Sequence, residues 1–349
     1  MQNLECSLKN CSFKKKLPAL MSFLLIATLA GAQNQAHSPT YKYFRLGNAQ
    51  DATTKATPGY ALMGGGSDLD EAFRWLCDKD PGGDFLVLRA AGDDDYNSYI
   101  KDLCHSNSVA TLIIPDRNSA ADPRVAELIH QAEAIFIAGG DQARYINWWQ
   151  HTPVQDALNA HIAVGKPIGG TSAGLAVLGE FIYSAQGDAP DDPDLKSIQA
   201  LANPYFSRVT VRRDFLNIPL LHNTLTDSHF AKHDRMGRTL TFLARIVQDG
   251  WSSNPREIAI DEKSAVLVEP DGSARVIGSG KGAYFLSIEK PPQTCAENTP
   301  LTFRDITVYH GTPGSEFNVK EWKAKSGANY SLSVVAGQVQ STQPNHEIY

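Results

Sequence analysis

The sequence lacks the motifs of the commonest cofactor-dependent and nucleic-acid-binding proteins. Its 349 residues contain no Walker motif, and the glycine run at 64–66 lacks the G-x-G-x-x-G spacing of a dinucleotide site. The formal net charge is -6, and no long basic run follows the N-terminus, which excludes the usual pattern of a nucleic-acid-binding surface. The five cysteines show none of the paired spacings of a zinc site. We therefore expect no cofactor, no metal ion and no nucleic-acid partner.

The N-terminal apolar run, residues 17–32, is too short for a comfortable membrane span. Three lysines at 14–16 precede it, and Ala30-Gly31-Ala32 ends it with the small-x-small pattern of signal-peptidase cleavage. We predict a signal peptide over 1–32, cleaved near Ala32, and a secreted or periplasmic protein with no membrane attachment after cleavage. An uncleaved anchor is the alternative.

Cysteine is scarce in the part that would remain after cleavage, where only Cys77, Cys104 and Cys295 are left. An oxidising compartment favours one disulfide and one free thiol among the three, but the sequence does not indicate which two would pair. None of them has the surroundings of a catalytic nucleophile.

The remaining chain divides by composition into three parts. Residues 33–58 are polar and predict a tether. From residue 59 to 290, short apolar runs alternate with helical patterns, as in βαβ units, which predicts an α/β three-layer sandwich with a mainly parallel central sheet. Residues 291–349 predict a β-rich extension and tail. Sites in such sheets lie at the carboxyl ends of the strands, where three glycine-bearing turns fall: 64–66, 139–140 and 169–170.

The third of these turns carries a candidate nucleophile. Gly170-Thr171-Ser172-Ala173-Gly174 fits the G-x-S-x-G pattern, which places a serine at the tip of a sharp strand-to-helix turn. The pattern alone is equally compatible with a tight structural turn whose glycines let backbones approach closely.

A serine nucleophile needs a base and a group that orients the base. Of the ten histidines, His229 is the strongest candidate, because polar and charged residues crowd around it just before an amphipathic helix. A solvated helix entrance is the alternative interpretation of that segment. Asp261 and Glu262 follow an apolar run, and either carboxylate could hold the imidazole.

The order serine, histidine, acid argues against an α/β-hydrolase esterase. That fold runs serine, acid, histidine, and would have to pair Asp261 with His310. Its usual HGGG-type loop is also missing from the sequence.

Four separated segments carry a resemblance to a known family. They are AIFIAGGDQ at 134–142, GGTSAGLAVL at 169–178, DSHF with a following R-x-G-R at 227–238, and AIDEKSA at 259–265. In order and approximate spacing they resemble the cyanophycinase branch of the S51 serine peptidases, over about residues 60–288. The resemblance implies a class I glutamine amidotransferase-like, flavodoxin-like fold, and hydrolysis of the β-linked Asp-Arg units of cyanophycin.

The resemblance also implies roles for individual residues. Ser172 would be the nucleophile, His229 the base and Glu262 the orienting acid, and the amides of Gly140 and Ala173 would form the oxyanion hole. The residues expected to line the substrate site are Gln142, Asp227, Ser228, Arg235 and Arg238.

Two positions depart from the family pattern: Ser228 stands where glutamine is usual, and His233 where an arginine is expected. The expected partner is a peptide or a cyanophycin-like polymer, with a homodimer left open. A catalytically inactive binding protein on the same scaffold is the remaining alternative.

Overall fold

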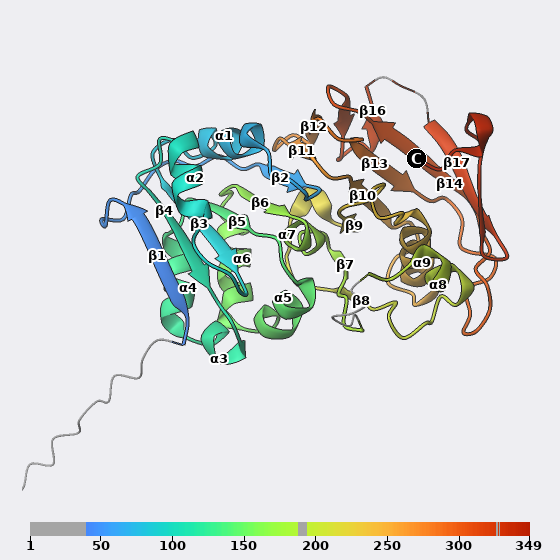
Figure 1. The fold of residues 1–349 in the computed structure, drawn as a ribbon, viewed down its shortest axis with the longest axis horizontal. Coiled ribbons are helices and arrows are strands. Elements are labelled where there is room, and N and C mark those ends of the chain that lie inside the picture. The colour runs from blue at the N-terminus through green and yellow to red at the C-terminus, as the bar shows by residue number, and fades with distance from the viewer. Residues whose placement is uncertain (1–39, 188–193, 326, 328) are drawn as a thin grey trace, which may run out of the picture. The chain divides into compact units, whose positions relative to one another are not determined.

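Two β-sheets and the helices around them build the computed structural model, which describes residues 40–187, 194–325, 327 and 329–349 (Figure 1). The chain from Pro39 to Tyr349 forms one compact unit. The predicted signal peptide lies outside the described residues. Among the described residues, no helix is long and apolar enough to cross a membrane.

The first sheet has ten strands with a parallel centre. The strand order is β1-β4-β3-β5-β6-β2-β11-β12-β15-β16. Five central strands run parallel: Tyr60–Met63 (β2), Asp84–Arg89 (β3), Ser108–Ile113 (β4), Ala134–Ile137 (β5) and Ile168–Thr171 (β6). The others pair antiparallel: Lys42–Gly47 (β1), Ser264–Val268 (β11), Ser273–Gly278 (β12), Glu316–Asn318 (β15) and Lys323–Ala324 (β16).

Helices cover both faces of this parallel centre. Asp70–Asp78 (α1) and Tyr96–Leu103 (α2) share one buried core with it. The opposite core takes in Arg117–Ala120 (α3), Pro123–Gln131 (α4), Gln142–Trp149 (α5), Pro153–Ala163 (α6) and Ala173–Ala176 (α7). The strands are buried along their whole length because helices pack on both sides, as their continuous apolar runs predict. The predicted α/β sandwich is confirmed.

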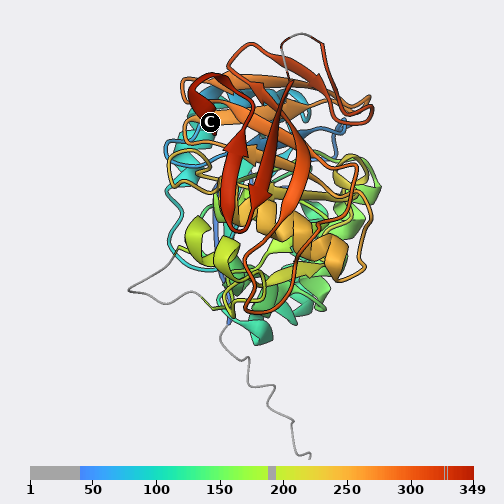
Figure 2. The same ribbon diagram turned by 90° about the vertical axis from the view of Figure 1, so that its right-hand side faces the viewer.

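The second sheet contains the C-terminal strands, drawn in orange and red and brought to the front in Figure 2. Its order is β18-β17-β14-β13-β10-β9-β7-β8. The strands are Phe181–Tyr183 (β7), Val211–Arg213 (β8), Thr224–Asp227 (β9), Arg256–Ile260 (β10), Ala283–Ser287 (β13), Phe303–Gly311 (β14), Asn329–Val335 (β17) and Gln338–Ser341 (β18). Met236–Gln248 (α9) packs on this sheet through one core and contacts Ser197–Ala202 (α8). The β-rich region after residue 290 is thus shared between the two sheets: β14, β17 and β18 join the second sheet, and β15 and β16 join the first.

The chain crosses between the two sheets at two places that matter for the site. It leaves β6 of the first sheet through α7 to reach β7 of the second, and it returns from β10 to β11. β9 and β10 run parallel, so their carboxyl ends lie side by side. Ser172, His229 and Glu262 each follow directly after one of these strands, which brings the three segments to one place.

The expectation of a tether over 33–58 is wrong for part of that range. Residues 42–47 form β1, which pairs antiparallel with β4 along six residues at the edge of the first sheet. Tyr41 and Tyr43 pack on the core, whereas Phe44 and Leu46 stay exposed. Burial thus alternates along β1, as in a strand with one covered face, within a composition that otherwise predicts loop.

The structure also answers which cysteines pair. Cys77 of α1 and Cys104 after α2 form a disulfide, with their Cα atoms 5.9 Å apart, and Cys295 is free and buried. The disulfide fastens the two helices that cover one face of the first sheet. A structural disulfide of this kind is typical of an oxidising compartment.

Candidate active site

Ser172 lies at a strained turn between β6 and α7. Its backbone has φ 53° and ψ -117°, a conformation that costs free energy for any residue other than glycine. The turn also packs tightly against β5: a Cβ atom at Gly174 would lie 1.9 Å from the carbonyl oxygen of Ile137. The second glycine of G-x-S-x-G is therefore required by close backbone contact. Strain held at one serine is characteristic of a nucleophile elbow.

Two hydrogen bonds link this serine to a histidine and a carboxylate. Ser172 Oγ lies 2.7 Å from His229 Nε2, and His229 Nδ1 lies 2.8 Å from Glu262 Oε1. The three residues are 57 and 33 positions apart in the chain and meet only through the strand crossovers. The geometry is that of a nucleophile, a base and a group that orients the base.

The charges of these groups fix the direction of both hydrogen bonds. The hydrogen bond from His229 is the main cause that lowers the pKa of Glu262, so its carboxylate is ionised and can only accept. His229 Nδ1–H must therefore donate to Glu262, which leaves the Nε2 lone pair to accept from the Ser172 hydroxyl. Burial lowers the pKa of His229 against the opposing effect of Glu262, so the ring is a neutral base at neutral pH.

The glycine run at 64–66 makes room for this pair. A Cβ atom at Gly65 would lie 2.5 Å from His229 Nε2, and Gly65 has φ +93°, which side chains rarely adopt. Its neighbour Gly66 lies against the side chain of Glu262. The run therefore serves the site as a backbone wall behind the imidazole.

The structure separates the two candidate carboxylates and removes His310 from the site. Asp261 is buried and accepts a hydrogen bond from the backbone N–H of Lys232 at 2.8 Å, so it anchors the loop that follows His229. His310 is hydrogen-bonded to the carbonyl oxygen of Lys281, and its ring stacks on that of Tyr284. The serine–acid–histidine order of an α/β-hydrolase is thus not the arrangement found here.

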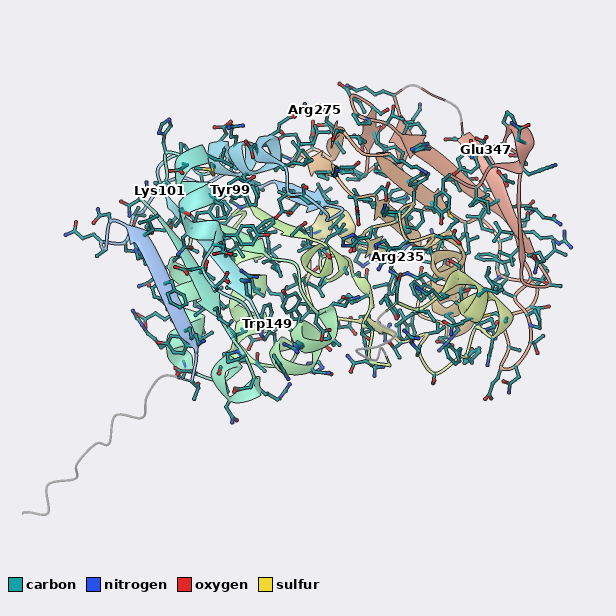
Figure 3. The ribbon with its side chains drawn as sticks, in the orientation of Figure 1. Tyr99, Lys101, Trp149, Arg235, Arg275 and Glu347 are labelled. Carbon is teal, nitrogen blue, oxygen red and sulfur yellow. A yellow bond between two sulfur atoms is a disulfide. The ribbon has the colours of Figure 1, made fainter. Side chains whose placement is uncertain are left out.

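A cavity of about 570 Å³ opens in front of Ser172. Gly140 and Ala173, the two expected oxyanion-hole residues, line it beside the serine. Its wall also holds the predicted substrate residues Gln142, Ser228, Arg235 and Arg238, together with His233. Figure 3 labels Arg235 on the loop between β9 and α9.

Comparison with known proteins identifies the family of this chain. The sequence model of peptidase family S51 matches residues 90–275, more than half of the chain. The chain belongs to peptidase family S51.

Several relatives of this S51 member are cyanophycinases. The cyanophycinase of Synechococcus elongatus is 30% identical over 218 residues, which cover 61% of each chain, and that of Geminocystis herdmanii is 25% identical over 229 residues, covering 64% of this chain and 75% of its own. The chain thus spans about three fifths of the length of the first relative. A crystal structure of a peptidase from an acI-B1 actinobacterium matches 79% of this chain with a TM-score of 0.46 and 17% identity.

Asp227 was expected to line the substrate site, and the structure corrects this expectation. Its side chain is only 3% exposed, and it is not part of the cavity wall. Both carboxylate oxygens accept hydrogen bonds from Arg238, at 2.6 to 3.0 Å. Arg238 is itself almost completely buried although it reaches the cavity wall, and it holds the Asp227 carboxylate behind that wall, away from a substrate.

Asp194 is a site residue that the sequence did not indicate. Its Oδ1 accepts hydrogen bonds from Arg235 at 3.0 Å and from Arg238 at 2.9 Å, and its Oδ2 lies 3.2 Å from His233 Nδ1. Burial alone would raise the pKa of Asp194, but the two guanidinium groups outweigh it and the pKa lies below its usual value. The residue ends an acidic run whose members look alike in sequence, so only the fold singles it out.

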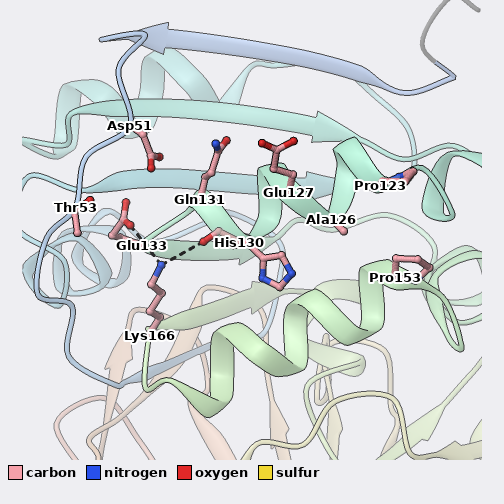
Figure 4. A pocket seen from close by; sticks show the side chains of 10 residues that line it. All are labelled: Asp51, Thr53, Pro123, Ala126, Glu127, His130, Gln131, Glu133, Pro153 and Lys166. Carbon is pink, nitrogen blue, oxygen red and sulfur yellow. Dashed lines mark hydrogen bonds and ion pairs between the residues drawn. The ribbon is translucent and has the colours of Figure 1, made fainter.

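A second hollow, of about 610 Å³, lies far along the first sheet and has no such chemistry (Figure 4). The amine of Lys166 is bonded there to the carbonyl oxygens of His130 and Ala132 and to Glu133. The charge of Lys166 is therefore engaged by groups at the end of α4.

Proposed function

We propose that this protein is a serine peptidase that hydrolyses β-aspartyl peptide bonds of the Asp-Arg type, and that it acts after secretion. The observation that carries the proposal is the hydrogen-bonded chain from Ser172 through His229 to Glu262. Relatives that are cyanophycinases support the substrate class. The disulfide between Cys77 and Cys104 and the N-terminal apolar run support the oxidising location.

The proposed reaction follows from the positions of these groups. Ser172 Oγ attacks the carbonyl carbon of the scissile bond while His229 Nε2 takes its proton. The oxyanion that forms accepts hydrogen bonds from the amides of Gly140 and Ala173. His229 then gives the proton to the leaving amine, which produces an acyl-enzyme on Ser172, and a water molecule activated by the same imidazole releases the acid.

The experiment that tests the proposal is digestion of cyanophycin and of a panel of α- and β-aspartyl dipeptides, with products identified by mass. Cleavage confined to β-aspartyl bonds supports it, whereas cleavage confined to ordinary α-peptides contradicts it. Reaction of the protein with a serine-directed phosphonate separates an enzyme from an inactive binding protein. Labelling at Ser172 is expected, and failure to label would favour the binding protein.

The acid limb of the pH–rate profile should lie at an unusually low pH. His229 acts as a base only when neutral, and burial lowers its pKa below the ordinary 6.5, so kcat/KM should fall only as pH drops through that lower value. The hydrogen bond to Glu262 acts in the opposite direction and raises this pKa. In Glu262→Gln the midpoint should therefore move to still lower pH; a midpoint above 6.5 in the unmodified enzyme would contradict the assignment of the base.

Glu262→Gln and Asp261→Asn should have effects of different size. Loss of the carboxylate that orients the imidazole should lower kcat less than loss of the nucleophile does. The fold-decrease in kcat should be about 10–100 times smaller. Asp261 contacts Lys232 and not the imidazole, so its amide variant should lose far less activity than Glu262→Gln. A comparison of kcat with folding checked by circular dichroism decides between them, and the reverse order would mean that the wrong carboxylate is assigned.

Ser228→Gln with His233→Arg should raise activity on cyanophycin relative to other β-aspartyl substrates. Both positions lie on the cavity wall. Ser228 is shorter than the glutamine of the family pattern, and His233 is less strongly charged than the expected arginine. Each lost hydrogen bond to a charged group costs about 1.5–3 kcal/mol, or roughly ten- to a hundred-fold in affinity. Measured kcat/KM values for cyanophycin and a β-aspartyl dipeptide test this; an unchanged ratio in the double variant would refute it.

A further inference from the structure

His233 faces the catalytic pair from the next turn of the same loop. Its ring lies 5.2 Å from that of His229, centroid to centroid, and its Nε2 lies 3.6 Å from Glu262 Oε1. His229 Nδ1 lies 2.8 Å from the same oxygen. One nitrogen from each imidazole and one carboxylate oxygen thus lie within 4.8 Å of one another. These are the donor atoms that zinc binds.

Two of the three donor distances are close to those around a tetrahedral ion, and the third, between the two imidazole nitrogens, is at most 4.8 Å. Zinc bonds to nitrogen and carboxylate oxygen are about 2.0–2.2 Å long, so neighbouring donors in a tetrahedron lie about 3.3–3.5 Å apart. The distance from His233 to Glu262 already has this size, and the one from His229 to Glu262 needs to open by about half an ångström. Three protein donors leave a fourth position for water, and the side chain of His233 is 40% exposed, so an ion has access from solvent.

A partly buried carboxylate already prepares His233 to be a ligand. Its Nδ1 lies 3.2 Å from Asp194 Oδ2, and Asp194 is held in place by Arg235 and Arg238. An Nδ1–H that donates to Asp194 leaves the Nε2 lone pair directed toward Glu262, where two acceptors then face each other. Carboxylates that orient the far side of a histidine in this way are common around zinc.

We propose that His229, His233 and Glu262 bind one zinc ion, and that this binding switches off the hydrolase proposed above, on which the inhibitory half of the inference rests. Binding requires the neutral ring to change tautomer: the Nδ1 proton leaves to solvent, Nε2 takes up one proton from solvent, and Nδ1 then presents its lone pair to the ion. With a proton on Nε2, the ring can no longer accept the proton of Ser172. Zinc therefore removes the base without touching the nucleophile.

Zinc binding is measured first on tag-free Ser172→Ala protein, which needs no activity. Titration calorimetry should give one zinc ion per chain, and Co²⁺ in place of zinc should give the absorption of a tetrahedral site. His233→Gln in the same background should weaken zinc binding by at least about tenfold. The matched control is His222→Gln, because His222 lies 3.5 Å from the carboxylate of Glu180 but belongs to no cluster of three donors among the described residues. Binding that is absent, or unchanged by His233→Gln, overturns the site.

Inhibition is measured separately with the phosphonate label at Ser172. Zinc should slow labelling of the unmodified protein at least about tenfold, relative to its own zinc-free rate, and His233→Gln should abolish that slowing while His222→Gln preserves it. Zinc that binds through His233 but leaves labelling unaffected would overturn the inhibition and keep the site. Protein that never labels, even without zinc, would instead contradict the proposed hydrolase, and the calorimetric result would still decide the site.

Discussion

Ser172→Ala should abolish hydrolysis while the fold persists. The change removes the attacking oxygen, and a nucleophile and its base act as one unit, so kcat should fall by at least about 10³-fold and by as much as about 10⁶-fold. The hydroxyl makes one hydrogen bond to a side chain, to His229, and the strained backbone at this position tolerates alanine no worse than serine. We therefore expect a stability close to that of the unmodified protein. Initial rates and thermal unfolding of the same preparations provide the measurement.

His229→Ala serves as the matched comparison. It should be about as damaging as Ser172→Ala, and the double variant should be no worse than either, because each removes the same unit. Effects that multiply in the double variant would mean that the two residues act independently. Near-full activity in Ser172→Ala would end the proposal of a serine mechanism altogether.

The parts of the fold that depend on local pattern were predictable from the sequence. The start of α4 follows from local signals alone: Asp122 accepts a hydrogen bond from the backbone of Arg124, and Pro123 stands at the first helical position. The elements from β2 to β6, and the four strands around the turn at Asp271-Gly272, also follow their apolar runs. In these segments hydrophobic period and capping residues agree, and no distant contact is needed to decide the structure.

What depends on distant contacts was not predictable. The choice of Glu262 over Asp261 is made by the turn after β10, which directs one carboxylate to the imidazole and the other to a backbone amide. Asp194 gains its importance from its hydrogen bonds to Arg235 and Arg238, which are distant from it in the chain. The segment at β1 becomes a strand only because it pairs with β4 at the edge of the first sheet. Sequence composition does not show that β4 has an open side for another strand.

Breaking the buried pair of Asp227 and Arg238 should have the second-largest effect that we predict. This effect is a loss of folding stability. Arg238 is enclosed by the protein, with Asp227 supplying three of its hydrogen bonds and Asp194 a fourth, and the rings of Tyr183 and Phe242 lie within 6 Å of its guanidinium carbon. Removing Asp227 leaves the buried guanidinium with Asp194 alone, a carboxylate that Arg235 also engages, so the charge of Arg238 is only partly compensated. Asp227→Leu should therefore lower the free energy of unfolding by about 3–5 kcal/mol.

The same network distinguishes a structural pair from a substrate-binding one. If the charges mainly compensate each other, Asp227→Leu combined with Arg238→Met should lose clearly less stability than the sum of the two single variants, with a coupling of about 1–3 kcal/mol. Arg124→Ala, which breaks a half-exposed ion pair with Glu127, is the control and should cost at most about 1 kcal/mol. Urea unfolding of the unmodified protein, the two single variants, the double variant and the control gives these numbers. Additive losses would mean that Asp227 and Arg238 stabilise the fold separately. An Asp227→Leu variant with unchanged stability and a raised KM would instead mean that Asp227 binds substrate, despite its burial.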